Sequence, residues 1–121
     1  MSFVPDNVIQ NLPSMDRSSA DAQPFGVIKL SDDGVIQLYN KWESEMGGFE
    51  PSAVEGKNFF TKVAACTNNR LVFGRFKDGV SSGQMDAEFN YTFTYRMKPN
   101  PVLIRLYRDT AGNNWCFVSK K

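Results

Sequence analysis

Apolar and polar residues alternate along the last third of the chain. A two-residue period is typical of β-strands that bury one face and expose the other. The apolar positions of the first strand predicted in this region are Phe89, Tyr91, Phe93, Tyr95 and Met97. Those of the second, after a predicted loop at residues 99–101, are Val102, Ile104 and Leu106. A third strand is predicted at residues 115–118, after a turn at residues 109–114.

A β-hairpin is predicted nearer the N-terminus. Residues 25–30 and 35–39 are rich in apolar, strand-forming residues. The sequence Ser-Asp-Asp-Gly at residues 31–34 separates them and is typical of a turn. Tyr39 is therefore expected at the end of the second strand.

Short helices are predicted on both sides of this hairpin. Residues 1–24 carry scattered apolar positions among prolines and polar residues, which predicts an N-terminal cap of one or two short helices. The cap has little surface to bury, so we expect it to be among the less stable parts of the fold. Residues 40–55 predict one or two helical turns followed by an irregular loop. Residues 57–64 predict another short helix that ends near Cys66.

One longer helix is predicted between the hairpin and the last three strands. Asn68 or Asn69 can cap its start, and Gly83 follows its predicted end at about Ser82. Its apolar face, with a spacing of four residues, is formed by Val72, Phe76 and Val80.

This order of elements predicts an α+β domain. We expect a five-stranded antiparallel sheet with helices packed on it, formed by a single domain of 121 residues. Residues 1–24 would be the cap and residues 25–121 the core. The same order resembles that of the PAS sensory domains, and fold alone does not give a function.

Composition excludes several classes of partner. Hydrophobic residues make up 41% of the chain and the net charge is +1, which is ordinary for a globular protein and unfavourable for binding nucleic acid. No apolar run is long enough to cross a membrane. The N-terminal residues lack the pattern of a secretory signal. We therefore expect a cytoplasmic protein that is a monomer or a weak dimer and signals to a partner that the sequence does not identify.

The cysteine and histidine content limits the chemistry further. The chain has two cysteines, which do not form a disulfide framework of the secreted type. It has no histidine, so the Cys-His and Ser-His catalytic pairs and the usual haem ligand are absent, and a zinc site is disfavoured. We expect that the protein is not an enzyme and holds no metal.

Specific short runs in the middle of the chain resemble the photoactive yellow protein family. Each run alone is a weak signal, whereas their combination is specific and spans nearly the whole chain, most weakly in the cap. The matching runs are Tyr39-Asn40, Glu43, Gly-Lys-Asn-Phe-Phe at residues 56–60, Val-Ala-x-Cys-Thr at residues 63–67, Tyr-Thr-Phe-Thr-Tyr-Arg-Met-Lys-Pro at residues 91–99, and Phe-Gly-Val-Ile-Lys-Leu at residues 25–30.

The resemblance implies a light-absorbing group on Cys66. In the family, 4-hydroxycinnamic acid (p-coumaric acid) is bound to a cysteine as a thioester, and its phenolate accepts hydrogen bonds from a tyrosine and a glutamic acid. The implied donors here are Tyr39 and Glu43, and the backbone N–H of Cys66 would bind the thioester carbonyl. A lone cysteine is more often a small buried apolar residue, which is how we interpret Cys116.

A buried phenolate at neutral pH needs strong stabilisation by its surroundings. A phenol has a pKa of about 10, so ionising it at pH 7 requires roughly 4 kcal/mol, and burial alone opposes it. Two hydrogen bonds to the charged oxygen, each worth about 1.5–3 kcal/mol, offset much of that cost. Glu43 can donate only as a neutral acid, which a dry pocket favours. Without the matching runs, Glu43 would be interpreted as an exposed helix residue paired with a lysine.

The resemblance also implies a pocket wall around the ring. These residues are equally consistent with an ordinary hydrophobic core, and the two interpretations are compatible. The predicted pocket residues are Ile28, Gly47, Phe49, Phe59, Val63, Ala64, Thr67, Phe93, Tyr95 and Met97.

Three positions depart from the family pattern. Gly47 replaces a threonine that hydrogen-bonds the tyrosine hydroxyl, Phe49 replaces an arginine at the pocket mouth, and Ala65 replaces a proline before the cysteine. These changes affect the tuning of the chromophore more than its identity. We expect part of the population to hold a protonated chromophore that absorbs further to the blue.

Three other functions fit parts of the sequence. A PAS module that only binds partners or another ligand would lack colour. A flavin photosensor of the light-oxygen-voltage type would carry a cysteine in the helix that here has the sequence Gly-Lys-Asn-Phe-Phe-Thr-Lys-Val. An enzyme with Cys66 as its nucleophile would need a base other than histidine.

Overall fold

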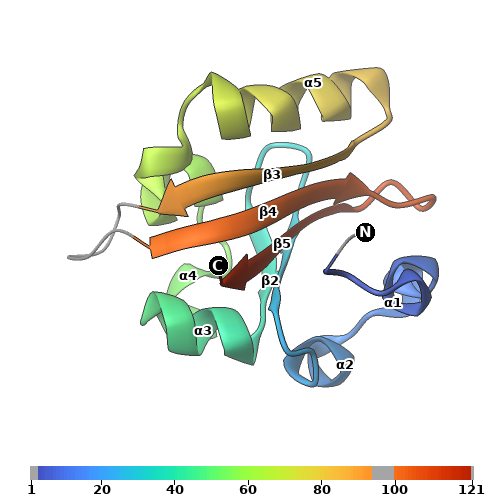
Figure 1. Cartoon of the computed structure of the whole chain (residues 1–121), viewed down its shortest axis with the longest axis vertical. Helices are drawn as coiled ribbons and strands as arrows, with labels where there is room; N and C mark the ends of the chain where they lie inside the picture. Colours follow the sequence, from blue (N-terminus) through green and yellow to red (C-terminus); the bar gives the residue numbers. More distant parts are fainter. Residues whose placement is uncertain (1–2, 94–99, 121) are drawn as a thin grey trace.

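The computed structural model describes residues 3–93 and 100–120. Its centre is a five-stranded antiparallel sheet with the strand order β2-β1-β5-β4-β3 (Figure 1). The strands are β1 (Gly26–Leu30), β2 (Ile36–Tyr39), β3 (Asp86–Phe93), β4 (Asn100–Arg108) and β5 (Asn114–Lys120). The predicted α+β class with a five-stranded antiparallel sheet is confirmed.

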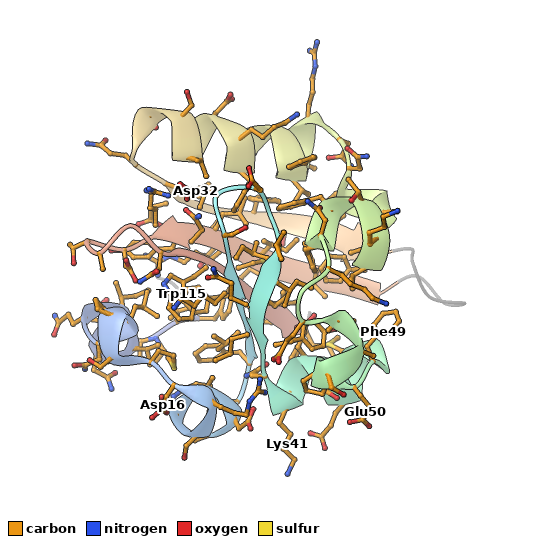
Figure 2. The ribbon with its side chains drawn as sticks, turned by 180° about the vertical axis from the view of Figure 1, so that it is seen from behind. Asp16, Asp32, Lys41, Phe49, Glu50 and Trp115 are labelled. Atoms are coloured by element: carbon orange, nitrogen blue, oxygen red, sulfur yellow. The ribbon has the colours of Figure 1, made fainter. Side chains whose placement is uncertain are left out.

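The N-terminal segment covers one face of the sheet. It forms α1 (Asp6–Gln10), the 3-10 turn η1 (Leu12–Ser14) and α2 (Arg17–Asp21), and Figure 1 shows α1 and α2 together, far from α5. The segment and this sheet face share a hydrophobic cluster, which includes Trp115 (Figure 2). The buried members of this cap cluster are Val4, Val8, Leu12, Ala20, Phe25, Val27, Leu38, Trp115 and Phe117.

The remaining helices and the other face of the sheet enclose the larger core. They are α3 (Lys41–Gly47), α4 (Pro51–Val54), η2 (Phe59–Val63), η3 (Ala65–Thr67), η4 (Arg70–Gly74) and α5 (Arg75–Ser82). Side chains alternate between faces along a strand, so Val27 belongs to the cap cluster and its neighbour Ile28 to this main cluster. Each face of the sheet therefore has its own core, with the sheet between them.

The two helices predicted around Cys66 differ from the expectation. The predicted helix at residues 57–64 is a single π-helical turn, η2, held at its start by the Asn58 side chain, which accepts from the N–H groups of Phe60 and Thr61. The longer helix begins as another π-helical turn, η4, and becomes α-helical only at Arg75. Asn69 caps it as predicted, and Gly83 ends it in the left-handed conformation.

The predicted loop at residues 99–101 overlaps strand β4. Asn100 and Pro101 already belong to β4, where they pair with Phe93 and Thr92 of β3. The described pairs between β4 and β5 begin only at Val102. Pro101 thus lies at the start of the strand, where a missing N–H group is tolerated.

Candidate functional site

Glu43 lies in the first turn of α3, directly after strand β2. Asn40 caps this helix, because its side-chain oxygen accepts a hydrogen bond of 3.1 Å from the backbone N–H of Glu43. An asparagine at this position satisfies a helix N–H that would otherwise have no partner. The cap places Tyr39 at the end of the strand and Glu43 four residues later, as the sequence predicts.

The carboxyl group of Glu43 is completely buried. The residue is only 1% exposed, and its Oε2 is a buried atom with no hydrogen-bond partner in the described part of the chain. Burial raises the pKa of Glu43 to about 8, because water no longer stabilises the charged form. At neutral pH the group is therefore a neutral acid with a proton to donate, and an exposed Glu43 paired with a lysine is excluded.

Tyr39 is buried on the same side of the sheet as this acid. The residue is 0% exposed and lies opposite Ile28 of β1. Ile28 in turn lies opposite Cys116 of β5. The pKa of the Cys116 thiol is raised by burial and further by the nearby Glu43. Cys116 is thus an unreactive packing residue, in agreement with the sequence interpretation.

Cys66 lies in η3, at the wall of the main cluster. Its side chain is half-buried and packs against that cluster. Its carbonyl oxygen accepts a hydrogen bond of 2.5 Å from the Tyr91 hydroxyl and another of 3.0 Å from the Asn69 amide. The Tyr91 bond attaches the loop that carries the thiol to strand β3, and the Asn69 bond holds the loop locally.

The structure brings most of the predicted pocket residues into one compartment. Phe49, between α3 and α4, packs against the main cluster from its edge (Figure 2). Gly47 is buried at the end of α3. Tyr95 and Met97 lie outside the described residues. The predicted pocket residues buried within the main cluster are Ile28, Phe59, Val63, Ala64 and Phe93.

Thr67, another predicted pocket residue, has a local hydrogen-bond partner. It is buried, but its hydroxyl donates a hydrogen bond of 2.6 Å to the carbonyl of Ala64. The hydroxyl therefore stabilises the turn that carries Cys66.

Three further residues support the site, although the sequence analysis assigned them no role in it. Asn40, Asn69 and Tyr91 hold α3 and the Cys66 loop in place through side-chain hydrogen bonds. Asparagine just before a predicted helix is a recognisable capping signal and identified Asn69 as a cap. The second role of Asn69, as a donor to the Cys66 carbonyl, depends on tertiary contacts and has no signal in the sequence.

The three side chains that the resemblance singles out, those of Tyr39, Glu43 and Cys66, lie in or near the main cluster. Tyr39 is a buried member of the main cluster and the half-buried Cys66 packs against that cluster, while the buried Glu43, whose Oε2 has no partner among the described residues, lies against Gly26 of β1. Across residues 3–93 and 100–120, no three His, Cys, Asp or Glu side chains are close enough to hold a metal ion. In the same ranges, no helix has the length and apolar character needed to span a membrane.

Comparison with known proteins gives a consistent picture. No family model matches the sequence. The chain is 36% identical to the photoactive yellow protein of Rhodothalassium salexigens over 121 residues, which cover 99% of this chain and 97% of that protein. It is 32% identical to the photoactive yellow protein of Rhodobacter capsulatus, with 99% of both chains covered.

Solved structures give the same result. The photoactive yellow protein domain of the sensor histidine kinase Ppr from Rhodospirillum centenum matches with a TM-score of 0.86 and 42% identity, covering 92% of this chain and 98% of that domain. A light-oxygen-voltage protein from Rhodobacter sphaeroides matches with a TM-score of 0.69 at 14% identity, which is a likeness of fold alone.

Proposed function

The chain belongs to the photoactive yellow protein family, and from this premise we propose that it is a blue-light receptor with 4-hydroxycinnamic acid bound to Cys66 as a thioester. The coarser statement, that the chain is a PAS domain of a photoreceptor family, follows directly from its relatives. The covalent group and the roles of the individual residues are the proposal.

One observation supports the proposal most strongly. The Oε2 atom of Glu43 is buried and has no hydrogen-bond partner within residues 3–93 and 100–120. Such an atom costs free energy in a folded protein, so its persistence calls for a functional explanation. A hydrogen bond from a neutral Glu43 to a phenolate oxygen supplies that explanation.

Three groups of this chain would hold the chromophore. Tyr39 and Glu43 would donate hydrogen bonds to the phenolate oxygen, and each bond to a charged acceptor is worth about 1.5–3 kcal/mol. The backbone N–H of Cys66 would donate to the thioester carbonyl. The aromatic residues of the main cluster exclude water, which strengthens these bonds further.

Light provides the signal by changing the charge of Glu43. When bound, the group supplies absorption of blue light and isomerisation of its vinyl bond from trans to cis. Glu43 then gives its proton to the phenolate oxygen and becomes a carboxylate in a site that is almost closed to water. An isolated buried charge costs several kcal/mol, which is comparable with the stability of a weakly held segment.

The N-terminal cap is the segment that we expect to respond. The cap lies on the opposite face of the sheet from Glu43, yet Asn40 connects the two. Its side-chain amide donates bonds of 2.8 Å to the carbonyl of Ala20 and 3.0 Å to that of Phe25, while its oxygen caps the helix of Glu43. Movement of this helix therefore strains the bonds that hold the cap.

Release of the cap would expose apolar surface to a signalling partner. One similar domain is part of a sensor histidine kinase, which is consistent with signalling to a protein or a neighbouring domain. We propose a cytoplasmic sensor without catalytic activity of its own. A PAS module that binds a different ligand is the alternative function.

Reconstitution tests the proposal directly. Purified protein is incubated with activated 4-hydroxycinnamic acid, and its absorption spectrum and intact mass are recorded. The expected result is one cinnamoyl adduct per chain and an absorption band in the visible that bleaches under blue light. The two cysteines provide a matched control, because Cys66→Ala should abolish the adduct and Cys116→Ala should keep it.

The alternative predicts a different result. A protein that folds but forms no adduct on Cys66, or forms one that stays colourless at every pH, would overturn the proposal. Circular dichroism of the same samples establishes that each variant is folded.

A further inference from the structure

Gly26 occupies an unusual position beneath the carboxyl group of Glu43. It is a buried residue of strand β1, paired with Val118 of β5. Five glycines of the described residues have a positive φ, and Gly26 is not one of them. Backbone conformation therefore does not require glycine here, and the reason must lie in the space around it.

That space is filled by the side chain of Glu43. A Cβ atom built on Gly26 would lie 2.1 Å from Oε2 and 3.2 Å from Cδ of Glu43, and 3.2 Å from Cε3 of Trp42. A separation of 2.1 Å is far inside the contact distance of non-bonded atoms, which is about 3.5–4.0 Å between carbons. Even the smallest side chain at position 26 would displace the carboxyl group.

We propose that Gly26 is a positioning residue for the acid: its missing side chain lets the carboxyl group of Glu43 lie directly on strand β1, and this contact fixes where Oε2 is presented. The positioned atom is the same buried oxygen that has no partner in the described part of the chain. The backbone of β1 thus bounds the carboxyl group on one side.

The neighbouring residues are consistent with this arrangement. Ile28 lies two residues along β1 on the same face, opposite Cys116 of β5. The contact with Gly26 places the acid at the β1–β5 pair, and the pKa of the Cys116 thiol, raised by burial and further by Glu43, is consistent with this position. The acid thus lies in an apolar environment in which the strand backbone fixes its height above the sheet.

A purely structural role for Gly26 predicts different behaviour. Gly79 in α5 provides the comparison, because a Cβ atom there would lie 2.6 Å from Cβ of Met85, remote in sequence from the acid. Gly26→Ala and Gly79→Ala both overfill a buried space. Only the first should act through Glu43.

A double-mutant cycle in the chromophore-free protein tests whether Gly26 positions the carboxyl group of Glu43. Gly26→Ala, Glu43→Ala and the double variant are compared by urea unfolding. Overfilling should lower the folding equilibrium constant of Gly26→Ala by roughly 10- to 100-fold. In the Glu43→Ala background the same methyl group enters the vacated space, so the loss should shrink to about threefold or less. Gly79→Ala should cost the same in both backgrounds.

Infrared spectroscopy supplies a readout that general destabilisation does not move. The C=O stretch of the protonated Glu43 carboxyl is identified by its disappearance in Glu43→Gln. Its frequency should shift in Gly26→Ala and stay unchanged in Gly79→Ala. Where Gly26→Ala does not fold, restored folding of the double variant supports the proposal. Additive losses in the cycle, or an unshifted band in folded Gly26→Ala, would overturn it.

The inference rests on the proposed function only for the role of Glu43 as a hydrogen-bond donor to the chromophore, and not for the position of its carboxyl group. Both measurements use protein without chromophore, so they succeed or fail independently of any colour. Failure of reconstitution removes the light-sensor proposal and leaves the positioning intact. In reconstituted protein, displacement of the acid should raise the pKa of the chromophore phenol by about 1–2 units, as expected for loss of a hydrogen bond to a charged oxygen.

Discussion

The guanidinium group of Arg17, in the N-terminal cap, forms an ion pair with Glu55, and the same Glu55 carboxylate accepts a hydrogen bond of 3.0 Å from the backbone N–H of Tyr39. Arg17 also donates a bond of 3.4 Å to the carbonyl of Tyr39. Arg17 and its partner Glu55 therefore bind both backbone polar groups of Tyr39, a proposed chromophore ligand: Arg17 binds the carbonyl and Glu55 binds the N–H.

Two further bonds extend this contact along the chain. Ala20 accepts a hydrogen bond from the Asn40 side chain at 2.8 Å, and Asp21 accepts one from the backbone N–H of Lys41 at 2.7 Å. Helix α2 thus binds three consecutive residues just before Glu43. Among the cap elements, α2 is the one that we expect to sense a change in the helix of Glu43.

The first prediction concerns the Arg17 ion pair. Arg17→Gln removes the charge and keeps a hydrogen-bond donor. The side chains of Arg17 and Glu55 are 48% and 24% exposed, so the pair should contribute about 0.2–1 kcal/mol. Opening of the cap should therefore become up to roughly fivefold more frequent in the dark. Native-state hydrogen exchange of the α2 amides measures it, and added salt should reduce the difference.

A second ion pair provides the control. Arg105 of β4 pairs with Asp86 of β3 at 2.9 Å, on the two strands at the opposite edge of the sheet from β2, whose last residue Arg17 contacts. Arg105→Gln should leave exchange in α2 unchanged. If Arg17→Gln and Arg105→Gln had equal effects on the α2 amides, the ion pair in the cap would not be a specific link.

The second prediction follows from the raised pKa of Glu43. In the unfolded chain this group titrates near the ordinary value of 4.5, and in the folded protein without chromophore its pKa is about 8. A raised pKa means that the folded state holds the proton more tightly. The stabilisation is fully present below pH 4.5 and is lost as the pH rises to about 8. Urea unfolding across this range should show stability falling by several kcal/mol.

Glu43→Gln is the control for this pH dependence. The glutamine cannot ionise, so the slope between the two pKa values should flatten. Asp16, Asp32 and Asp109 have lowered pKa values through their hydrogen bonds, so their stabilisation is lost only at acidic pH, below the range of Glu43. An unchanged slope in Glu43→Gln would mean that another group causes the loss.

The sequence allowed the sheet to be predicted well because its signals are local. The apolar alternation at Val102, Ile104 and Leu106 corresponds to three fully buried residues of β4. The turn before Val35 and the glycine that ends α5 were equally visible. The helices around Cys66 were predicted less well, because π-helical turns have no periodicity of their own in the sequence.

The residues of the candidate site were predicted from the resemblance to a family, and the structure shows how the fold encloses Glu43. Local pattern could not place Glu43 inside the protein, since glutamate is rarely buried. The resemblance identified it, and burial confirmed that the acid is enclosed. Gly26 and the Arg17–Glu55 pair depend on residues that are distant in sequence. No pattern along the chain predicts such contacts.

The third prediction concerns the attachment loop. The Asn69 side chain caps the helix through the N–H of Val72 at 3.0 Å and donates to the carbonyl of Cys66. Asn69→Ala should lower the free energy of unfolding by about 0.5–2 kcal/mol, as loss of a helix cap does. Thermal recovery after a light flash should also change, since the loop that carries Cys66 becomes less constrained. The neighbouring Asn68→Ala is the control, and equal effects would contradict the prediction.

The fourth prediction concerns Gly47, which lies one turn after Glu43 on α3 and is buried. Gly47→Thr restores the hydroxyl that the resemblance leads one to expect beside Tyr39. A pH titration of the dark spectrum should show a mixture of a blue-shifted protonated form and a yellow form in the parent protein. The threonine should lower the midpoint and increase the yellow fraction. Gly47→Val adds the same volume without a hydroxyl and should not. A parent protein that is fully ionised down to acidic pH would contradict this expectation.

The fifth prediction tests whether a buried charge drives release of the cap. Glu43→Gln keeps a hydrogen-bond donor in nearly the same volume and cannot become an anion. In reconstituted protein the parent should show increased hydrogen exchange in α1 and α2 under blue light, because a carboxylate enclosed at 1% exposure destabilises its surroundings. Glu43→Gln should still bleach and should lose most of that increase.

Arg17→Gln separates this step from the strength of the cap itself. Arg17→Gln weakens the attachment of α2 without altering Glu43. In this variant, hydrogen exchange of the α2 amides should be faster than in the parent in the dark, and faster still under light. In Glu43→Gln, exchange of the same amides should remain slow both in the dark and under light. If light released the cap equally in Glu43→Gln and in the parent, the enclosed carboxylate would not be the cause, and isomerisation alone would have to move α3.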